Sequence, residues 1–291
     1  MQFTGLKKIA LKDREYFNRQ LMFSQTMSCE QSFTNLYCWQ DSCDTHWFEY
    51  NSQLFIWYAA ENLLLMPAGK FISPETLAKI LSGIAGAGNS GAIYDVPLAY
   101  IEQYPELAEL FIISEADAEF DYIYKVDKLI NFSGKKLRKK RNLLKQFFEL
   151  YPNSRIEPLA NSHGTDCLKL NSQINYDKPH LTDETVAIER FFAAFDELKG
   201  SGCAIYIDDK LIGFSVVSLL NETVACEHFE KIDHQYKGAA QVLVNETAKR
   251  LPEDVLYLNR EQDMGIMGLR QAKRSYDPEL ILKRYRLTIN D

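Results

Sequence analysis

Residues 222–240, ETVACEHFEKIDHQYKGAA, predict a strand, a tight turn and the start of a helix, and most other segments can be interpreted as support for this unit. Residues 222–232 alternate in polarity and are rich in strand-forming side chains. A short apolar strand at 255–258 comes next, then a polar loop at 259–263 and a second helix that Tyr276-Asp277-Pro278 ends. This order predicts an α/β unit in the last third of the chain.

The turn has the pattern Gln235-x-x-Gly238-x-Ala240, in which small residues stand where a helix begins. The backbone N–H groups of such a turn have no partner within the helix and lie at the positive end of its dipole, so the turn can bind a phosphate or pyrophosphate. Glycine and alanine also open many ordinary helices. Both interpretations of the turn stay open.

The loop after the 255–258 strand places one base and two acids, Arg260, Glu261 and Asp263, behind a strand end. Open α/β sheets bind ligands at such places. The alternative is a solvated loop in which Asp263 caps the next helix. The sequence alone favours neither interpretation.

Several of these residues carry a family resemblance. They are the signature at 235–240, the pair Glu230-Lys231, the run 257–265 (YLNREQDMG) and the run 268–278 (GLRQAKRSYDP). The signature resembles that of the GNAT N-acyltransferase superfamily. The long runs resemble the C-terminal domain of phosphatidylglycerol lysyltransferase (the LPG-synthase, DUF2156 group). Weaker sequence similarities at 121–124 and 134–142 extend the resemblance to nearly the whole chain.

The resemblance implies an α/β (α+β) fold of tandem GNAT-like domains with mixed, mostly antiparallel sheets. We therefore expect a degenerate N-terminal domain at 1–126, a basic bridging helix and connector at 127–160, and a C-terminal domain at 161–291. Known members of the family transfer an amino acid from aminoacyl-tRNA to a lipid headgroup. The same resemblance implies a transferase with an aminoacyl-tRNA donor.

The composition agrees with a two-domain globular protein. The 291 residues suggest two domains of about 150 residues each, and 46% of them are hydrophobic, so each domain can bury a core. The net charge of −7 argues against binding nucleic acid over a large surface but is compatible with a local basic site.

Cysteine usage and hydropathy bear on metals and location. Six cysteines occur, at 29, 38, 43, 167, 203 and 226; none forms Cys-x-x-Cys, and no Cys or His cluster has zinc-site spacing. We therefore expect no metal, and reduced thiols in a cytoplasmic protein. No apolar run approaches the roughly 18–20 residues of a membrane helix, unlike lysyltransferases that carry a membrane domain. Contact with lipid headgroups would then be peripheral.

The N-terminal half reads as a second, degenerate copy of the same arrangement without a phosphate turn. Residues 54–58 and 63–66 predict a hairpin. Ser73 and Pro74 predict a helix that runs to about residue 85, and strands are expected at 92–96 and 120–126, the latter closing this half.

The basic segment GKKLRKKRN at 134–142 predicts one helix, capped by Ser133 and running to about residue 150. Lys140 and Arg141 lie on or beside its apolar face and are interpreted as an anion site between the domains. The other basic residues of the segment are interpreted as a solvated face. Residues 151–181 are expected to be an irregular connector with one or two strands, including one at 155–159, followed by a helix from Thr182.

Acyl transfer to an amine or hydroxyl needs a base, an acid for the leaving group and donors for the developing oxyanion. GNAT enzymes place a base on the strand before the turn and a tyrosine acid later, which points to Glu230 and Tyr276. The alternatives are an edge-strand charge for Glu230 and a packing tyrosine for Tyr276. Arg260, Arg270 and Lys273 are candidates for holding phosphate or the terminal adenosine.

Three hypotheses follow. The first is an aminoacyltransferase that uses aminoacyl-tRNA and an amine or hydroxyl acceptor, including a lipid headgroup. The second is an acyl-coenzyme A-dependent N-acyltransferase, favoured by the turn at 235–240. The third is a non-catalytic binding module that retains the GNAT fold.

Overall fold

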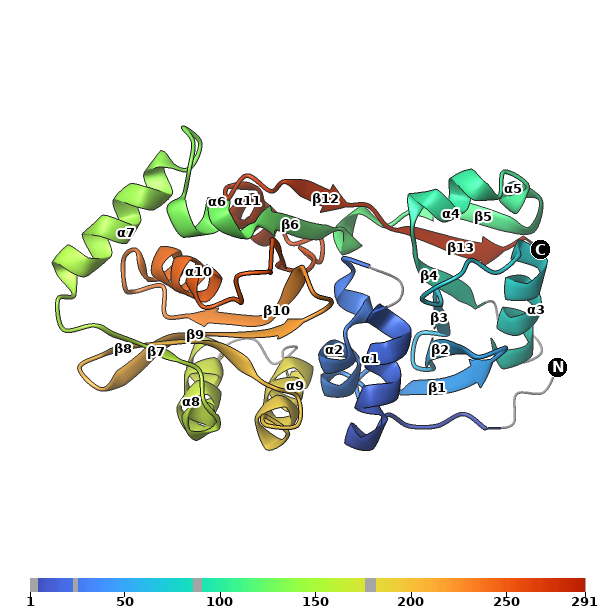
Figure 1. The fold of residues 1–291 in the computed structure, drawn as a ribbon, viewed down its shortest axis with the longest axis horizontal. Helices are drawn as coiled ribbons and strands as arrows, with labels where there is room; N and C mark the ends of the chain where they lie inside the picture. The colour runs from blue at the N-terminus through green and yellow to red at the C-terminus, as the bar shows by residue number, and fades with distance from the viewer. Residues whose placement is uncertain (1–4, 23–25, 86–90, 176–181, 291) are drawn as a thin grey trace. The chain divides into compact units, whose positions relative to one another are not determined.

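The computed structural model describes residues 5–22, 26–85, 91–175 and 182–290, which form two compact units. Unit 1 contains Met1–Asp121 and Leu282–Asp291, and unit 2 contains Tyr122–Ile281. Each unit has its own sheet with helices packed on it (Figure 1). In the described residues both sheets are mixed and mostly antiparallel, as expected, since the pairs β3–β4 and β10–β11 are parallel and the other pairs of known register are antiparallel.

The sheet of unit 1 has the strand order β1-β2-β3-β4-β13-β5. Its strands are β1 (Thr45–Tyr50), β2 (Gln53–Tyr58), β3 (Leu63–Leu65), β4 (Ala92–Val96), β5 (Phe111–Glu115) and β13 (Tyr285–Ile289). Its helices are α1 (Arg14–Met22), α2 (Phe33–Cys38), α3 (Pro74–Ala85), α4 (Leu98–Gln103) and α5 (Leu107–Leu110). The predicted hairpin, the helix from Pro74 and the strand at 92–96 are confirmed.

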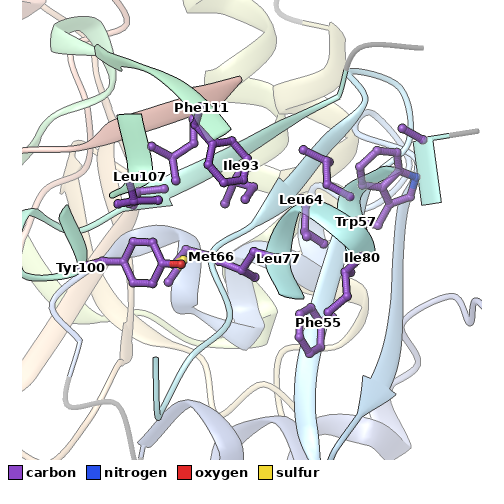
Figure 2. Packing of buried hydrophobic residues seen from close by; sticks show 14 of the residues in the cluster. Phe55, Trp57, Leu64, Met66, Leu77, Ile80, Ile93, Tyr100, Leu107 and Phe111 are labelled. Atoms are coloured by element: carbon purple, nitrogen blue, oxygen red, sulfur yellow. The ribbon is translucent and has the colours of Figure 1, made fainter. Parts of the chain in front are cut away.

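The core of unit 1 forms where α3 packs on this sheet. Leu77, Ile80 and Leu81 recur at helical spacing and are completely buried with Leu64 and Ile93 of the central strands (Figure 2). Burying a side chain of this size contributes about 1.5–3 kcal/mol. This short-range pattern explains why the helix could be predicted from the sequence.

The C-terminal strand belongs to the sheet of unit 1, so the expectation of one C-terminal domain at 161–291 differs from the compact units. β13 lies between β4 and β5 and pairs antiparallel with both. The buried guanidinium of Arg284, just before β13, forms ion pairs with Asp95 and Asp121 of the same unit. These partners stand 189 and 163 residues earlier, beyond the reach of a local pattern.

The sheet of unit 2 has the order β12-β6-β11-β10-β9-β8-β7. Its strands are β6 (Asp121–Lys125), β7 (Arg155–Pro158), β8 (Ser201–Ile207), β9 (Lys210–Leu219), β10 (Val224–Ile232), β11 (Tyr257–Asn259) and β12 (Leu280–Leu282). Its helices are α6 (Val126–Asn131), α7 (Arg138–Leu150), α8 (Gly164–Ile174), α9 (Thr182–Ala193), α10 (Ala239–Lys249) and α11 (Met267–Arg274).

Helices cover both faces of this sheet. α8 and α9 pack on one face, and α10 packs on the other together with α6 and α7 (Figure 1). Two expectations are corrected here. In the connector, the strand expected at 155–159 is present as β7, but α8 takes the place of the irregular chain expected after it. The strand expected at 120–126 does not close the first half, because β6 pairs with β11 of unit 2.

The basic segment also begins differently from the prediction. α7 starts at Arg138 after Leu137, and no side chain caps it, so Ser133 is not its cap. Gly134 has φ +87° and lies in the turn before the helix. The residues 127–160, expected to bridge two domains, lie entirely within unit 2.

Candidate functional site

The centre of the candidate site is Arg260, which follows β11 and is buried with two carboxylates of β10. Its Nε lies 2.6 Å from Glu227 Oε2, and its Nη2 forms an ion pair with Glu230. The side chains of Arg260 and Glu227 are only 7% and 2% exposed, while that of Glu230 is 26% exposed. The Arg260 cluster, defined as Arg260, Glu227 and Glu230, therefore has one solvent-facing carboxylate and one buried carboxylate.

A β-bulge places both glutamates on one face of the sheet. Alternation along a strand would send residues 227 and 230 to opposite faces. In the register with β9, Glu227 pairs with Val217 and Phe229 with Val216, so His228 is an extra residue. The glutamates thereby reach the same guanidinium.

The protonation of the cluster follows from burial. Burial and the neighbouring Glu230 raise the pKa of Glu227 to about 8, against the lowering effect of Arg260. Burial alone would lower the pKa of Arg260, but the two carboxylates raise it, so the guanidinium stays charged. The cluster can thus gain or lose a proton near neutral pH without losing its positive centre.

Two polar atoms of the cluster have no hydrogen-bond partner among the described residues. They are Nη1 of Arg260 and Oε1 of Glu227, both buried. An unsatisfied buried donor costs about 1–3 kcal/mol, and more when it is charged. One charged donor and one acceptor of the cluster therefore have hydrogen-bonding capacity that no described residue uses.

Aromatic rings frame the guanidinium. The Arg260 Cζ lies 5.0 Å from the ring centroid of Tyr276 and 5.6 Å from that of Tyr124. Gln241 of α10 donates to the Tyr276 hydroxyl at 3.1 Å, so the phenol hydrogen is not used in this bond. Burial raises the pKa of Tyr276 above its ordinary value, which keeps the phenol protonated.

Lys140 adds a second cation to the site. Its Nζ lies 3.8 Å from the centroid of the Tyr276 ring. Burial first, and then the positive charge of Arg260, lower the pKa of Lys140 to about 8, although Glu230 acts in the opposite direction. An ammonium with this pKa can donate a proton near physiological pH.

The loop 259–263 is held by residues that sequence analysis assigned to ligand binding. Asp263 receives hydrogen bonds from Tyr122 at 2.6 Å and from Arg270 Nε at 2.7 Å. Although burial opposes it, these bonds lower the pKa of Asp263. Lys273 donates to the carbonyls of Arg260 and Gln262. These contacts position Arg260.

The remaining predicted residues point elsewhere. Arg141 does not join Lys140; its Nη1 donates to the carbonyls of Phe132 and Gly134, beyond the end of α6. Glu261 turns away from Arg260 and approaches His228 at 3.1 Å. Arg260, Glu230 and Tyr276, together with Lys140, are thus the predicted residues that meet.

The Gln235–Ala240 turn packs against α7. Gly238 has φ +87°, and a Cβ built on it would lie 2.4 Å from the carbonyl oxygen of Leu143 and 3.0 Å from Phe147 Cβ. Close helix packing is therefore a sufficient reason for glycine here. Binding of a cofactor by Gln235 and Ala240 remains a prediction.

Glu227 and Gln241 are residues of the site that the sequence pattern does not identify. Glu227 was not selected because regular alternation places it opposite Glu230, and a bulge leaves no clear sequence signal. Gln241 is a buried polar residue in the first turn of α10. A polar side chain among the apolar residues at the start of a predicted helix indicates a hydrogen-bond partner in the interior.

An exposed apolar run follows the loop. Met264, Ile266, Met267 and Leu269 are 66%, 58%, 75% and 36% exposed. Large apolar side chains so close together are unusual at a surface that meets only water. Within the described ranges, no helix is both long and apolar enough to cross a bilayer.

Comparison with known families and proteins gives consistent matches. The family model "Phosphatidylglycerol lysyltransferase, C-terminal" matches residues 22–288. An uncharacterized protein of Mycoplasmoides gallisepticum is 28% identical over 236 residues, which cover 77% of this chain and 74% of that protein.

Solved structures resemble the whole chain. A conserved protein of unknown function from Bacteroides thetaiotaomicron has a TM-score of 0.92 at 29% identity, covering 99% of this chain and 100% of its own. L-PGS from Bacillus licheniformis has a TM-score of 0.68 at 12% identity, covering 98% and 93%. A GNAT-family acetyltransferase from Colwellia psychrerythraea has a TM-score of 0.54 at 10% identity, covering 99% and 100%. The last two show the fold alone, which is GNAT-like as expected.

Proposed function

The chain belongs to the family of the phosphatidylglycerol lysyltransferase C-terminal domain, a family of aminoacyl transfer to lipid headgroups, and on this premise we propose that it moves an aminoacyl group from aminoacyl-tRNA to a lipid-headgroup hydroxyl or amine. The reaction would take place at the Arg260 cluster and Lys140. The observation that carries the proposal is the unpaired, buried Nη1 of Arg260 beside Lys140.

The proposed step is a transesterification when the acceptor is a hydroxyl and an aminolysis of the ester when the acceptor is an amine. The acceptor oxygen or nitrogen attacks the carbonyl carbon that joins the amino acid to the terminal ribose. A new C–O or C–N bond forms, the ester C–O bond breaks, and one proton moves from the acceptor to the leaving ribose oxygen. The step needs no oxidant, reductant or further co-reactant.

Glu230 is the proposed base because it is the carboxylate of the cluster that reaches solvent, with 26% of its side chain exposed. Its ion pair with Arg260 fixes its orientation. Lys140, whose pKa of about 8 permits proton donation, is the proposed acid for the ribose oxygen. Tyr276 then orients Lys140 through its ring and remains a second candidate for the acid.

Negative charge develops on the carbonyl oxygen during attack. Arg260 Nη1 and the Lys140 ammonium are the donors that this oxyanion would meet. Fixed donors in a buried site stabilise such charge without reorganisation, and removing one typically lowers the rate about 10²–10³-fold. This would also satisfy the donor that has no partner among the described residues.

The tRNA donor is supported by the basic surface of α7 and the turn before it. Lys135, Arg138 and Lys139 are exposed there, near Lys140 in sequence. A local basic surface in an acidic protein suits one phosphate-rich segment, such as an acceptor end, better than a whole duplex. The coenzyme A hypothesis is less favoured, because α7 packs against the turn at Gly238.

The lipid acceptor is supported by the exposed run 264–269, which directly follows the loop of Arg260. Met267 and Ile266 could enter the headgroup region of a bilayer while Arg274, on the same helix and exposed, contacts anionic headgroups. The protein would then meet its acceptor as a peripheral protein at the membrane surface.

The test follows the loss of the aminoacyl ester from charged tRNA, with vesicles that contain phosphatidylglycerol and with a panel of soluble amines and alcohols. Arg260→Lys should lower discharge about 10²–10³-fold, because lysine cannot supply the second donor direction. Arg155→Lys is the matched control, since Arg155 is an exposed arginine of β7 that belongs to neither the Arg260 cluster nor the basic surface, and it should behave like the wild type.

The outcomes separate the three hypotheses. Discharge that requires Arg260 supports the proposal. Consumption of an acyl-coenzyme A without use of charged tRNA would replace it by the thioester hypothesis. If a folded protein uses neither donor, the binding-module hypothesis is the one that stands.

A further inference from the structure

We propose that Cys226, His228 and Glu261 form a binding site for a divalent transition metal of the zinc class. Among the described residues, their ligand atoms lie within 4.8 Å of one another. The site lies within unit 2 and uses none of the residues assigned to the transfer step. It therefore does not depend on the proposed function.

The chain builds the site from one strand and one loop. Cys226 and His228 are two apart on β10, and their ligand atoms come together beside the bulge. Glu261 comes from the loop after β11, where its φ of +54° is unusual for a residue with a Cβ. The Asn259 side chain accepts from the Glu261 N–H at 2.6 Å and holds this conformation. The carboxylate is thereby directed toward the strand.

The two distances to the Glu261 carboxylate match tetrahedral coordination. Cys226 Sγ lies 3.6 Å from Glu261 Oε1, and His228 Nδ1 lies 3.1 Å from the same oxygen. A zinc ion with bonds of about 2.3 Å to sulfur and about 2.0–2.1 Å to nitrogen and oxygen separates these atom pairs by roughly 3.6 and 3.3 Å. These two pairs therefore need shifts of only a few tenths of an ångström to bind the ion, and the Cys226 and His228 ligand atoms lie within 4.8 Å of each other.

The far side of the imidazole is already oriented. His228 Nε2 lies 2.7 Å from Ser218 Oγ, so it can carry the ring proton and donate it to the hydroxyl. Nδ1 then has a lone pair directed at the metal position. Metal-binding histidines commonly have such a partner for the second ring nitrogen, and losing it weakens metal binding about 10–100-fold.

Charge and donor type select the class of ion. The Cys226 thiolate and the Glu261 carboxylate neutralise a 2+ ion, and His228 contributes no charge. Cys226 and His228 are buried, where such neutralisation matters most. Thiolate and imidazole donors favour zinc over magnesium or calcium. The three protein donors leave one tetrahedral position for water or another ligand.

The site adjoins the Arg260 cluster along the chain. Glu227 stands between Cys226 and His228, and Arg260 directly precedes Glu261. A bound ion would join β10 to the loop 259–263 and so fix both elements that carry the cluster. We assign the ion this positioning role.

The experiment uses the full chain, stripped of metal with a chelator and titrated with Co²⁺ as a spectroscopic substitute for Zn²⁺. The wild type should bind one equivalent, develop a thiolate-to-cobalt charge-transfer band, and lose the band when Zn²⁺ displaces the cobalt. Cys226→Ser should abolish the band. Cys203→Ser is the matched control, because Cys203 is a buried cysteine of the same sheet and should leave the band unchanged.

Two further variants protect the test against misfolding. Glu261→Gln keeps the shape but removes the negative charge and should weaken Co²⁺ binding. Ser218→Ala should weaken it about 10–100-fold. A wild type that develops no band, or a band that survives in Cys226→Ser, would overturn the site. Failure of tRNA discharge with cobalt binding intact would count against the transfer proposal alone.

Discussion

Replacing Arg260 with methionine removes the single cation that binds the Glu227 and Glu230 carboxyl groups, and the cost above pH 8, where Glu227 is ionised in the wild type, can be worked from the structure. Glu227 is 2% exposed and loses the Nε donor at 2.6 Å, and Glu230 loses its ion-pair partner. Removing one partner of a buried ion pair costs about 3–5 kcal/mol, because the other charge stays buried and unpaired. For a unit of this size the melting temperature should fall by about 6–20 °C.

The cost should depend on pH, with a sign set by Glu227. The pKa of Glu227 in the folded wild type is about 8, above the unfolded value of about 4.3. A raised acid pKa contributes stability that is fully present below the unfolded value and is lost as the pH rises through the folded value. Without Arg260 the folded pKa rises further. Arg260→Met should therefore be mildly destabilising at pH 5 and strongly destabilising above pH 8.

The assay follows thermal unfolding by far-ultraviolet circular dichroism at pH 5, 7 and 8.5. All three tryptophans, at positions 39, 47 and 57, lie in unit 1, so their fluorescence provides a reference signal outside unit 2. Glu227→Gln in the Arg260→Met background should restore part of the loss, because it removes the unpaired charge. A loss of stability that is independent of pH, or no recovery in the double variant, would refute the charge-burial argument.

Three further predictions follow from single contacts. Because the pKa of Lys140 is about 8, the rate of tRNA discharge should fall as the pH rises through about 8. Lys140→Met should remove this fall at high pH, whereas Lys139→Met, at the exposed neighbour, should keep it. A fall that is retained in Lys140→Met would contradict the acid role. Met267→Ser, at a side chain that is 75% exposed, should weaken flotation with phosphatidylglycerol vesicles, and equal flotation would exclude this contact. Gly238→Ala should lower the free energy of unfolding, measured by denaturant titration, by about 1–3 kcal/mol. The reason is that the alanine Cβ would lie 2.4 Å from the Leu143 carbonyl oxygen. A variant as stable as the wild type would contradict the packing against α7.

The sequence predicted those parts of the fold whose signals are local. The helix from Pro74 is specified by its cap and by apolar residues at helical spacing, and the strand and turn around Gly238 by alternation followed by small residues. α8 was missed because its start, Gly164, has no side-chain cap and its turns are largely polar. The pairing of β13 with β4 was missed for another reason: strands almost 200 residues apart leave no mark on each other's local pattern.

The candidate site divides in the same way. Residue type and position after a strand identified Arg260, Glu230 and Tyr276, which the fold brings together. Residue type alone, without the direction of the side chain, also selected Arg270 and Lys273. Their cationic groups bind Asp263 and backbone carbonyls instead. The direction of a long side chain depends on tertiary contacts, and these do not follow from spacing.

One irregularity of β10 determines both the core and the chemistry of this region. Without the extra residue at His228, Phe229 would point toward Arg260 and Glu230 would enter the aromatic contact that Phe229 makes with Phe191 of α9. A charge would then be buried in the core, and the apolar ring would lie against the charged guanidinium, each at a cost of several kcal/mol. The bulge avoids both and leaves His228 beside Glu261 on the opposite face. The bulge thus sets the face that Glu227 and Glu230 occupy, and an ion bound by Cys226, His228 and Glu261 would hold β10 against the loop that carries Arg260.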